Sequence, residues 1–277
     1  MAGAGPAGLG CAAYLARAGR RVLVLDPSSP GGMAGKLPII ENYPGFPAGI
    51  SGSELARRLS AQARRWGARL RRDSLADLSR SRDGVTVRTD SGRTLSARTV
   101  CLAVGARFRR LGVPGEGLPG VGHASFHGPR GLDGEEVAVV GGGETAAYQA
   151  VACRRSGARV HLFFRGTRLK ANGRLLERLR AGGVILHPES RVLGILGRSG
   201  VRGVRFVSDG RKGELPVSRV FVLVGQEAPV SPSAGGLSRV FRAGDARGWR
   251  FRQACVAAAD GLAAGMRCER ILGASDA

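Results

Sequence analysis

The amino-acid sequence predicts an α/β fold built from two similar units, with the second unit inserted into the first. Two observations support this prediction. A glycine-rich turn, a helix and an apolar strand follow one another at residues 1–26, and the same pattern recurs at residues 136–164 behind a further strand. The run 21–26 is apolar without alternation, which is typical of a parallel strand covered on both faces. One unit repeated within 277 residues favours two domains.

The other elements follow from local patterns. In chain order we expect a helix at 6–18, strands at 21–26, 85–95 (a hairpin), 99–105 and 136–140, a helix up to about 155, strands at 159–164, 203–209 (a hairpin region) and 220–225, and a helix at 253–272. The segment 111–116 is rich in turn-forming residues and marks a domain boundary. The predicted domains are therefore residues 1–113 plus 229–277, which form a discontinuous unit, and residues 114–228, which form the inserted unit.

The composition excludes several classes of protein. The mean hydropathy is −0.05, and no apolar run approaches the roughly 18–20 residues that a membrane helix needs. No secretory leader precedes the first motif, so we expect a cytoplasmic protein without a membrane partner. The net charge is +22, but 40 of the 43 basic residues are arginines spread along the chain, and no nucleic-acid-binding motif accompanies them. We therefore predict no nucleic-acid partner, while a basic face that docks an acidic protein stays open.

The five cysteines are widely spaced. They form no Cys-x-x-Cys pair and have no zinc-site spacing, so we predict neither a disulfide framework nor a metal site. We expect each of them to be a small buried apolar residue. They are Cys11, Cys101, Cys153, Cys255 and Cys268.

The first glycine turn has the pattern of a dinucleotide-binding fingerprint. Gly3, Gly5 and Gly8 form G-x-G-x-x-G, in which the glycines allow a tight turn, close approach to a pyrophosphate and close helix packing. Pro6 and Ala7 then open the helix whose N-terminal amides would receive the phosphate. Asp26 ends the following strand, where an acidic residue binds ribose hydroxyls. With the second turn, this pattern predicts two Rossmann-like, three-layer (ββα) nucleotide-binding domains.

The first turn departs from the pattern upstream. A buried strand should precede it, yet only Met1 and Ala2 stand before Gly3. Either the true start lies earlier and has been clipped, or the sheet lacks its central strand and loses buried area and ladder hydrogen bonds. We favour the clipped or misassigned start.

The second turn reads G-x-G-x-x-A, and its strand ends without a carboxylate. Basic residues come after that strand instead, and a cation there favours the 2′-phosphate of NADPH over NADH. The alternative is that these are ordinary solvated surface charges. The candidate NADPH-binding residues are Gly141, Gly143, Glu144, Thr145, Ala146, Arg165 and Lys170.

Five motifs in this order resemble those of the low-molecular-weight thioredoxin reductase family, the class II pyridine nucleotide-disulfide oxidoreductases. The two glycine turns are joined by a Gly31-Gly32 loop with the run 41–46, by Gly115-Glu116, and by a C-terminal motif. The resemblance covers nearly the whole chain and implies FAD and NADPH as cofactors, an NADPH domain inserted into a discontinuous FAD domain, and a homodimer. The further residues assigned to FAD are Gly31, Gly32, Asn42, Gly105, Gly244, Asp245, Arg252, Gln253 and Ala254.

The chain differs from this family where the family carries Cys-x-x-Cys-Asp. His123 and Phe126 stand at the positions of the two cysteines, and His127 stands at the position of the aspartate. Thiol–disulfide exchange requires a thiolate, which neither imidazole nor phenyl provides. The family's paired arginines have become Arg165-Gly166, and the segment between Pro232 and Val240 is short by about twenty residues in comparison with the family.

These departures lead to a functional hypothesis with alternatives. The resemblance implies an oxidoreductase in which hydride passes from NADPH to FAD and electrons then pass to an acceptor other than a protein dithiol, such as a ferredoxin or flavodoxin, a quinone, a small disulfide or oxygen. His123 or His127 would supply a proton, although two loop histidines without a catalytic role explain the sequence equally well. One alternative is a non-catalytic or degenerate flavin- and NADPH-binding redox sensor. Another is that Cys255, beside the C-terminal motif, acts as a substitute redox thiol.

Overall fold

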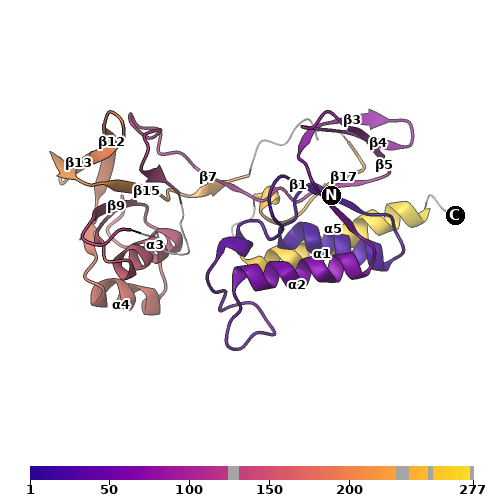
Figure 1. The fold of residues 1–277 in the computed structure, drawn as a ribbon, viewed down its shortest axis with the longest axis horizontal. Coiled ribbons are helices and arrows are strands. Elements are labelled where there is room, and N and C mark those ends of the chain that lie inside the picture. Colours follow the sequence, from indigo (N-terminus) through magenta and orange to yellow (C-terminus); the bar gives the residue numbers. More distant parts are fainter. Residues whose placement is uncertain (124–130, 229–236, 249–251, 275–277) are drawn as a thin grey trace. The chain divides into compact units, whose positions relative to one another are not determined.

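The computed structural model describes residues 1–123, 131–228, 237–248 and 252–274, and its chain divides into two compact units (Figure 1). Unit 1 comprises Met1–Arg107 and Ala228–Ala277, and unit 2 comprises Phe108–Glu227. The sequence-based boundaries lie at 113/114 and 228/229, so the first differs from the structural division by six residues. Within the described residues, no helix is both long and apolar enough to cross a membrane.

The central sheet of unit 1 is parallel. Strand β1 (Leu23–Asp26) pairs with β2 (Arg69–Arg72), and β6 (Val100–Leu102) pairs with β17 (Val240–Arg242). Ala2 lies between the two pairs and forms parallel bridges to Leu25 and Leu102. The order across the sheet is therefore β2, β1, the segment at Ala2, β6 and β17.

The gap that loss of the central strand would leave is not present beside Ala2. The amide of Ala2 donates to the carbonyl of Cys101 at 2.9 Å, and Ala103 returns a bond to Ala2 at 2.7 Å. On the other side Leu25 donates to Met1 at 2.9 Å. The Met1 amine donates to the carbonyl of Leu23 at 2.7 Å, and burial lowers the pKa of this amine. Residues 1–3 thus occupy the carboxyl-terminal part of the central strand position. They place the glycine turn at the carboxyl-terminal end of the parallel strands.

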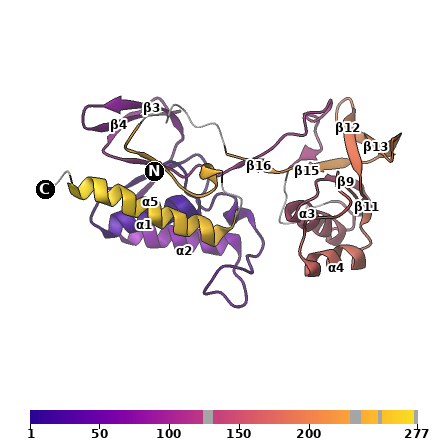
Figure 2. The same cartoon turned by 180° about the vertical axis from the view of Figure 1, so that it is seen from behind.

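Two layers cover this sheet. Helices α1 (Pro6–Arg17) and α5 (Ala254–Ala274) pack on one face through Ala7, Cys11, Ala264 and Cys268, and α2 (Gly52–Arg65) packs beside α1 (Figure 2). The opposite face is covered by an antiparallel sheet of β3 (Leu75–Ser81), β4 (Gly84–Thr89) and β5 (Thr94–Ala97). Leu78, Val85 and Val87 of this sheet pack against Ala2, Leu25 and Leu102.

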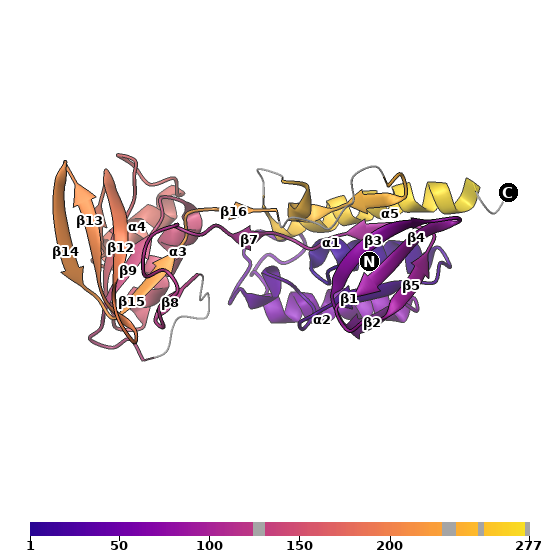
Figure 3. The ribbon, with the colours of Figure 1, turned by 90° about the horizontal axis from the view of Figure 1, so that it is seen from above.

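Unit 2 has the same three layers. Its five-stranded parallel sheet has the order β11, β10, β9, β15, β8, with bounds Ile185–His187, Arg159–Phe163, Glu136–Val140, Arg219–Val222 and Val121–Gly122. Helices α3 (Glu144–Arg155) and α4 (Gly173–Ala181) cover one face. Strands β12 (Ser190–Gly197), β13 (Val201–Ser208) and β14 (Arg211–Pro216) form the antiparallel layer, as Figure 3 shows.

The segments that pass from one unit to the other form two short strands, β7 (Arg107–Phe108) and β16 (Gln226–Glu227), which pair with each other. Two 3₁₀ turns complete the described structure: η1 (Ala34–Lys36) and η2 (Gly244–Arg247). The predicted α/β class with two Rossmann-like, three-layer units is confirmed.

Candidate functional site

The first glycine turn needs glycine at two positions for steric reasons. Gly3 has φ +99°, and a Cβ placed on it would lie 2.2 Å from the carbonyl oxygen of Ala103. A Cβ on Gly8 would lie 1.9 Å from the carbonyl oxygen of Gly3. A side chain at Gly3 would push the turn away from the end of β6, and one at Gly8 would push α1 away from the turn. At Gly5, by contrast, the nearest atom to a Cβ is 4.0 Å away, so its lack of a side chain serves an approach from outside.

The helices that begin at the two glycine turns have no side-chain cap. The N-cap residues of α1 and α3 are Gly5 and Gly143, and neither helix has a side-chain hydrogen bond to its first amides. Helices α2 and α4, by contrast, are capped, since Ser51 accepts from Glu54 in α2 and Asn172 accepts from Leu175 in α4. Only α1 and α3 among these four therefore leave their first N–H groups open to an anion.

Asp26 lies against the first turn, as the fingerprint predicts. Its Oδ2 accepts from the amide of Ala4 at 2.6 Å, and its Oδ1 accepts from the amide and hydroxyl of Ser28 at 2.8 and 2.9 Å. A carboxylate has about four acceptor positions, so these bonds fix its orientation and leave capacity for ribose hydroxyls.

Two further glycine segments lie on the first turn. The amide of Gly31 donates to the carbonyl of Ala4 at 2.8 Å, and a Cβ on Gly32 would lie 3.2 Å from the Cα of Gly5. Gly244, with φ +65°, brings the start of η2 against α1, where its own Cβ would lie 2.8 Å from that of Ala7. Gly105 also has positive φ (+71°), with no heavy atom within 4 Å of a Cβ.

The structure brings together two predicted flavin residues that are 211 positions apart. The side-chain amide of Asn42 donates to the side-chain carbonyl of Gln253 at 2.9 Å. Ala254 is the first residue of α5 and packs against the same buried cluster as Tyr43 and Phe46, which lie in the same loop as Asn42. Burial, with a smaller contribution from Cys255, raises the pKa of Tyr43.

Asp245 and Arg252 have the features expected beside an anionic ligand. Burial raises the pKa of Asp245, and the positive charge of Arg252 opposes that increase. The Nε of Arg252 is buried and, within the described residues, has no hydrogen-bond partner. A buried donor of this kind costs free energy unless a further acceptor satisfies it. The donors and the glycine cradle therefore fit a dinucleotide such as FAD.

Asp260 holds this segment, and the sequence interpretation did not single it out. Its Oδ2 accepts from the amide of Gly244 at 2.8 Å, and its Oδ1 accepts from Arg247 at 2.6 Å. The usable signal was an isolated acid within the apolar final helix, six residues after Ala254.

The second glycine turn repeats the steric pattern in unit 2. Gly141 has φ +151°, and a Cβ on it would lie 2.3 Å from the carbonyl oxygen of Leu223. Ala146 stands where the third glycine would be, and its own Cβ is 3.1 Å from a Cβ built at Gly141. Ala146 is fully buried, whereas Thr145 is half-buried and Glu144 is exposed.

The two predicted cations lie on the segment after β10. The amide of Lys170 donates to the carbonyl of Gly142 at 2.8 Å, which holds this segment beside the turn. Arg165 and Lys170 are both exposed, and neither forms an ion pair among the residues that the structure describes. Glu144 is engaged by Asn172 at 2.9 Å. The arrangement leaves the two cations available for a phosphate.

His123 lies at the end of the sheet of unit 2. Its Nδ1 is 2.9 Å from the carbonyl of Val222 and therefore carries the proton, which leaves Nε2 as an acceptor. The ring stacks on Phe108 with a centroid distance of 5.4 Å. His127 and Phe126 lie outside the described residues.

The cysteines form no disulfide among the described residues, and the hydrogen bond with Cys11 lowers the pKa of the buried Cys268. All five are free thiols, and all except the half-buried Cys255 are buried, as the sequence predicts for most of them. Burial raises the pKa of Cys153 to about 11, and hydrogen bonds to Cys101 and Cys268 raise the pKa of Cys11. Buried thiols whose protonated form is favoured are poor nucleophiles. No group of three or more potential metal ligands occurs within the described ranges.

Comparison with known proteins agrees with this geometry. The family model for pyridine nucleotide-disulphide oxidoreductases matches residues 2–244. A thioredoxin reductase from Mycolicibacterium smegmatis is 35% identical over 300 residues, which cover 99% of this chain and 96% of that protein. The chain belongs to the pyridine nucleotide-disulphide oxidoreductase family.

Members of this family are FAD-dependent enzymes, and its thioredoxin reductase-like members use FAD and NADPH. The bifunctional thioredoxin reductase/thioredoxin of Mycobacterium leprae is 34% identical over 98% of this chain, which spans 64% of that longer protein. A crystal structure of Lactococcus lactis thioredoxin reductase in its FR conformation has a TM-score of 0.90 and 25% identity, with 98% of this chain and 97% of that chain covered. Within the pyridine nucleotide-disulphide oxidoreductases, the chain is therefore of the thioredoxin reductase-like type.

Proposed function

We propose that this chain is an FAD-dependent NADPH oxidoreductase whose electron acceptor is not a protein dithiol. The observation that supports the proposal is the replacement of the family's cysteine pair at residues 123–126, together with the positions of the remaining cysteines. Cys153 and three others are buried in helices or the sheet, and Cys255 has no cysteine at the required spacing. A dithiol relay would have no thiolate to begin it.

In this proposal the two glycine turns hold the cofactors. The open amides of α1, the carboxylate of Asp26 and the side chain of Arg252 would bind FAD, with Asn42 and Gln253 near its ring. The open amides of α3, with Arg165 and Lys170, would bind NADPH. Bound FAD supplies the redox chemistry, accepting hydride from the nicotinamide and passing electrons onward. The protein residues bind, orient and exclude water.

The net charge of the chain favours one class of electron acceptor. With a net charge of +22, the protein would attract acidic electron carriers such as a ferredoxin or flavodoxin. A quinone, a small disulfide or oxygen are the small-molecule alternatives.

A cytoplasmic location and a homodimer complete the proposal. Exposed apolar residues on one side of α5, including Val256, Leu262 and Met266, support a surface for a second copy, and light scattering would measure the assembly.

An anaerobic NADPH titration of the purified yellow holoprotein tests the proposal. We expect one equivalent of NADPH to bleach the flavin absorbance, and we expect ferricyanide, quinone or oxygen to restore it. Thioredoxin should not be reduced. A flavin that NADPH does not bleach would support the non-catalytic redox sensor instead, and rapid reduction of thioredoxin that is lost in Cys255→Ser would support the substitute thiol.

His123 is the proposed proton carrier of this site. Its Nδ1 proton is engaged by Val222, so the exposed Nε2 would exchange the proton. In His123→Gln we expect the reoxidative half-reaction to lose its pH dependence, as followed by stopped flow. Unchanged rates across the pH range, in this variant and in His127→Gln, would leave both histidines without a catalytic role.

A further inference from the structure

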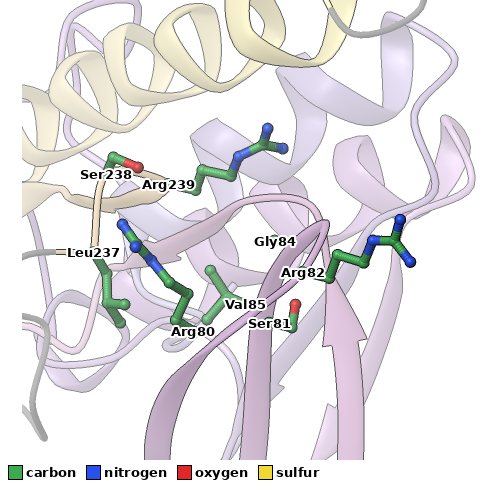
Figure 4. Close-up of a pocket in the computed structure, with 8 residues that line it drawn as sticks. All are labelled: Arg80, Ser81, Arg82, Gly84, Val85, Leu237, Ser238 and Arg239. Carbon is green, nitrogen blue, oxygen red and sulfur yellow. The ribbon is translucent and has the colours of Figure 1, made fainter.

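A cavity in unit 1 lies away from the residues assigned to the cofactors. It has a volume of 510 Å³ and opens between the end of β3, the start of β4 and the segment 237–239 that precedes β17 (Figure 4). The amide of Val100, the first residue of β6, donates to the carbonyl of Arg239 at 3.0 Å. The cavity is therefore beside the amino-terminal ends of β6 and β17.

The glycine turn lies at the opposite ends of these strands. Gly3 approaches the carbonyl oxygen of Ala103, which comes directly after the last residue of β6. The length of the strands thus separates the cavity from the first turn, and none of the candidate FAD or NADPH residues lines it. A ligand in this cavity would be distinct from both cofactors.

Three arginines line the cavity, and none of the described residues that line it is acidic. The arginines are Arg80, Arg82 and Arg239. None of them forms an ion pair with any residue in the described part of the chain, and Arg239 donates only to the backbone carbonyl of Asp83, at 3.3 Å. Guanidinium groups that no carboxylate neutralises favour an anionic ligand in the cavity that they line.

The arrangement of these side chains indicates the class of ligand. Figure 4 shows the arginines spread around Gly84 and Val85, with Arg80 extending toward Ser238 and Arg82 directed away from it. The hydroxyls of Ser81 and Ser238 add donors, and Val85 and Leu237 provide an apolar part of the wall. Cations that are spread apart suit separate anionic groups rather than one.

We propose that this cavity binds a small organic or inorganic polyanion that carries at least two phosphate or carboxylate groups. The volume lies within the range of about 300–1,000 Å³ that small-molecule sites occupy, and a planar guanidinium pairs with either oxyanion through two parallel hydrogen bonds. The proposal is independent of the redox function, because it depends on the hairpin of β3 and β4 and on the segment before β17.

Isothermal titration of the FAD-loaded protein with tripolyphosphate and with citrate, in the presence of saturating NADP⁺ so that the phosphate site of the second glycine turn is occupied, tests the proposal. We expect one site in the wild-type protein and a loss of affinity of roughly tenfold or more in Arg80→Gln/Arg239→Gln, since each charge-assisted hydrogen bond contributes strongly. The matched control is Arg93→Gln, which removes an exposed arginine from the other end of the β4–β5 sheet. Tighter binding of tripolyphosphate indicates a phosphate ligand, and tighter binding of citrate indicates a carboxylate ligand.

Two further results decide whether the cavity is the site. Arg165→Gln/Lys170→Gln should bind tripolyphosphate as the wild type does, because those cations belong to the second glycine turn. If binding is lost in that variant, or falls equally in Arg93→Gln, or is absent from the wild type at millimolar concentration, the proposal is wrong. Retained flavin absorbance and an unchanged melting temperature in each variant show that the fold is intact.

Discussion

The two glycine turns have a similar backbone arrangement but differ in the residues at the end of the strand that follows. In unit 1, β1 ends in Asp26, whose carboxylate accepts from the amide of Ala4 inside the turn. In unit 2, Arg165 stands just beyond β10, and the turn is instead joined to the backbone of Lys170. The helices behind both turns are uncapped by side chains. The shared part therefore prepares a phosphate site, and the residues at the strand end distinguish the nucleotides.

The largest expected effect comes from the first turn itself. In Gly8→Ala the new Cβ would meet the carbonyl oxygen of Gly3 at 1.9 Å, so we expect loss of FAD and destabilisation by at least about 2 kcal/mol, as in overpacked cores. Gly5→Ala has space for its methyl group and should fold normally, while its methyl hinders the pyrophosphate. Urea unfolding and flavin content measure the two effects. Equal losses of stability in both variants would contradict the expectation that Gly8 is required for packing and Gly5 only for cofactor binding.

The next effect concerns the cations of the second turn. In Arg165→Gln/Lys170→Gln we expect the KM for NADPH to rise by roughly tenfold to a hundredfold, because charge-assisted bonds to the 2′-phosphate are lost. The KM for NADH should change little, since it lacks that phosphate. Steady-state kinetics with both nucleotides measure the change, and Arg211→Gln, an exposed arginine of the same unit, serves as control. An equal rise in the KM for NADH would mean that Arg165 and Lys170 do not recognise the 2′-phosphate.

A smaller effect is expected from the acid of the first turn. In Asp26→Asn the side-chain oxygen can still accept from the amide of Ala4. The NH₂ group that replaces the other oxygen cannot accept from the amide of Ser28, so that hydrogen bond is lost. We expect FAD affinity to fall by about tenfold, with the KM for NADPH unchanged. Fluorescence titration of apoprotein with FAD measures the affinity, and the exposed Asp90→Asn is the control. Unaltered FAD affinity would remove Asp26 from the proposed site.

The smallest effect concerns a histidine pair in unit 2, in which His161 is buried and His187 is half-buried. His161 is 2.8 Å from Glu136 through Nε2 and 2.9 Å from His187 through Nδ1. Burial, together with a smaller contribution from the charge of His161, lowers the pKa of His187 below 6.5. The unfolded chain then binds more protons, so the stability contribution is full above about pH 6.5 and is lost as the pH falls through the lower folded pKa.

Unfolding by urea between pH 5 and 8 checks this prediction. The free energy of unfolding should fall toward acid in the wild type and fall less in His187→Gln, whereas His123→Gln, at an exposed position, should follow the wild type. Identical pH dependence in His187→Gln would show that another group dominates. His161 and His187 were not assigned any role from the sequence, because their contact joins β10 to β11 across 26 residues.

Some elements missed from the sequence carried local signals. Helix α2 begins after Ser51 with Glu54 three positions later, the pattern of a capping box, and α4 begins after the cap residue Asn172. Strand β2 had no comparable signal, because its pattern Arg69–Arg72 is mostly charged and it is a strand only through pairing with β1. Edge pairing of this kind depends on a partner strand and not on local propensity.

By itself, the sequence determined the two Rossmann-like units, the glycine turns, the acid at Asp26 and the absent cysteine pair, because spacing and residue type act locally along the chain. The tertiary structure alone decided that Ala2 pairs on both sides within the central sheet, since its partners Leu25 and Leu102 are brought beside it only by folding. It also decided the contact of Asn42 with Gln253, the arginine-lined cavity and the burial of the Arg252 Nε, which has no partner in the part of the chain that the structure describes. Each depends on long-range packing, whose partners no local pattern specifies.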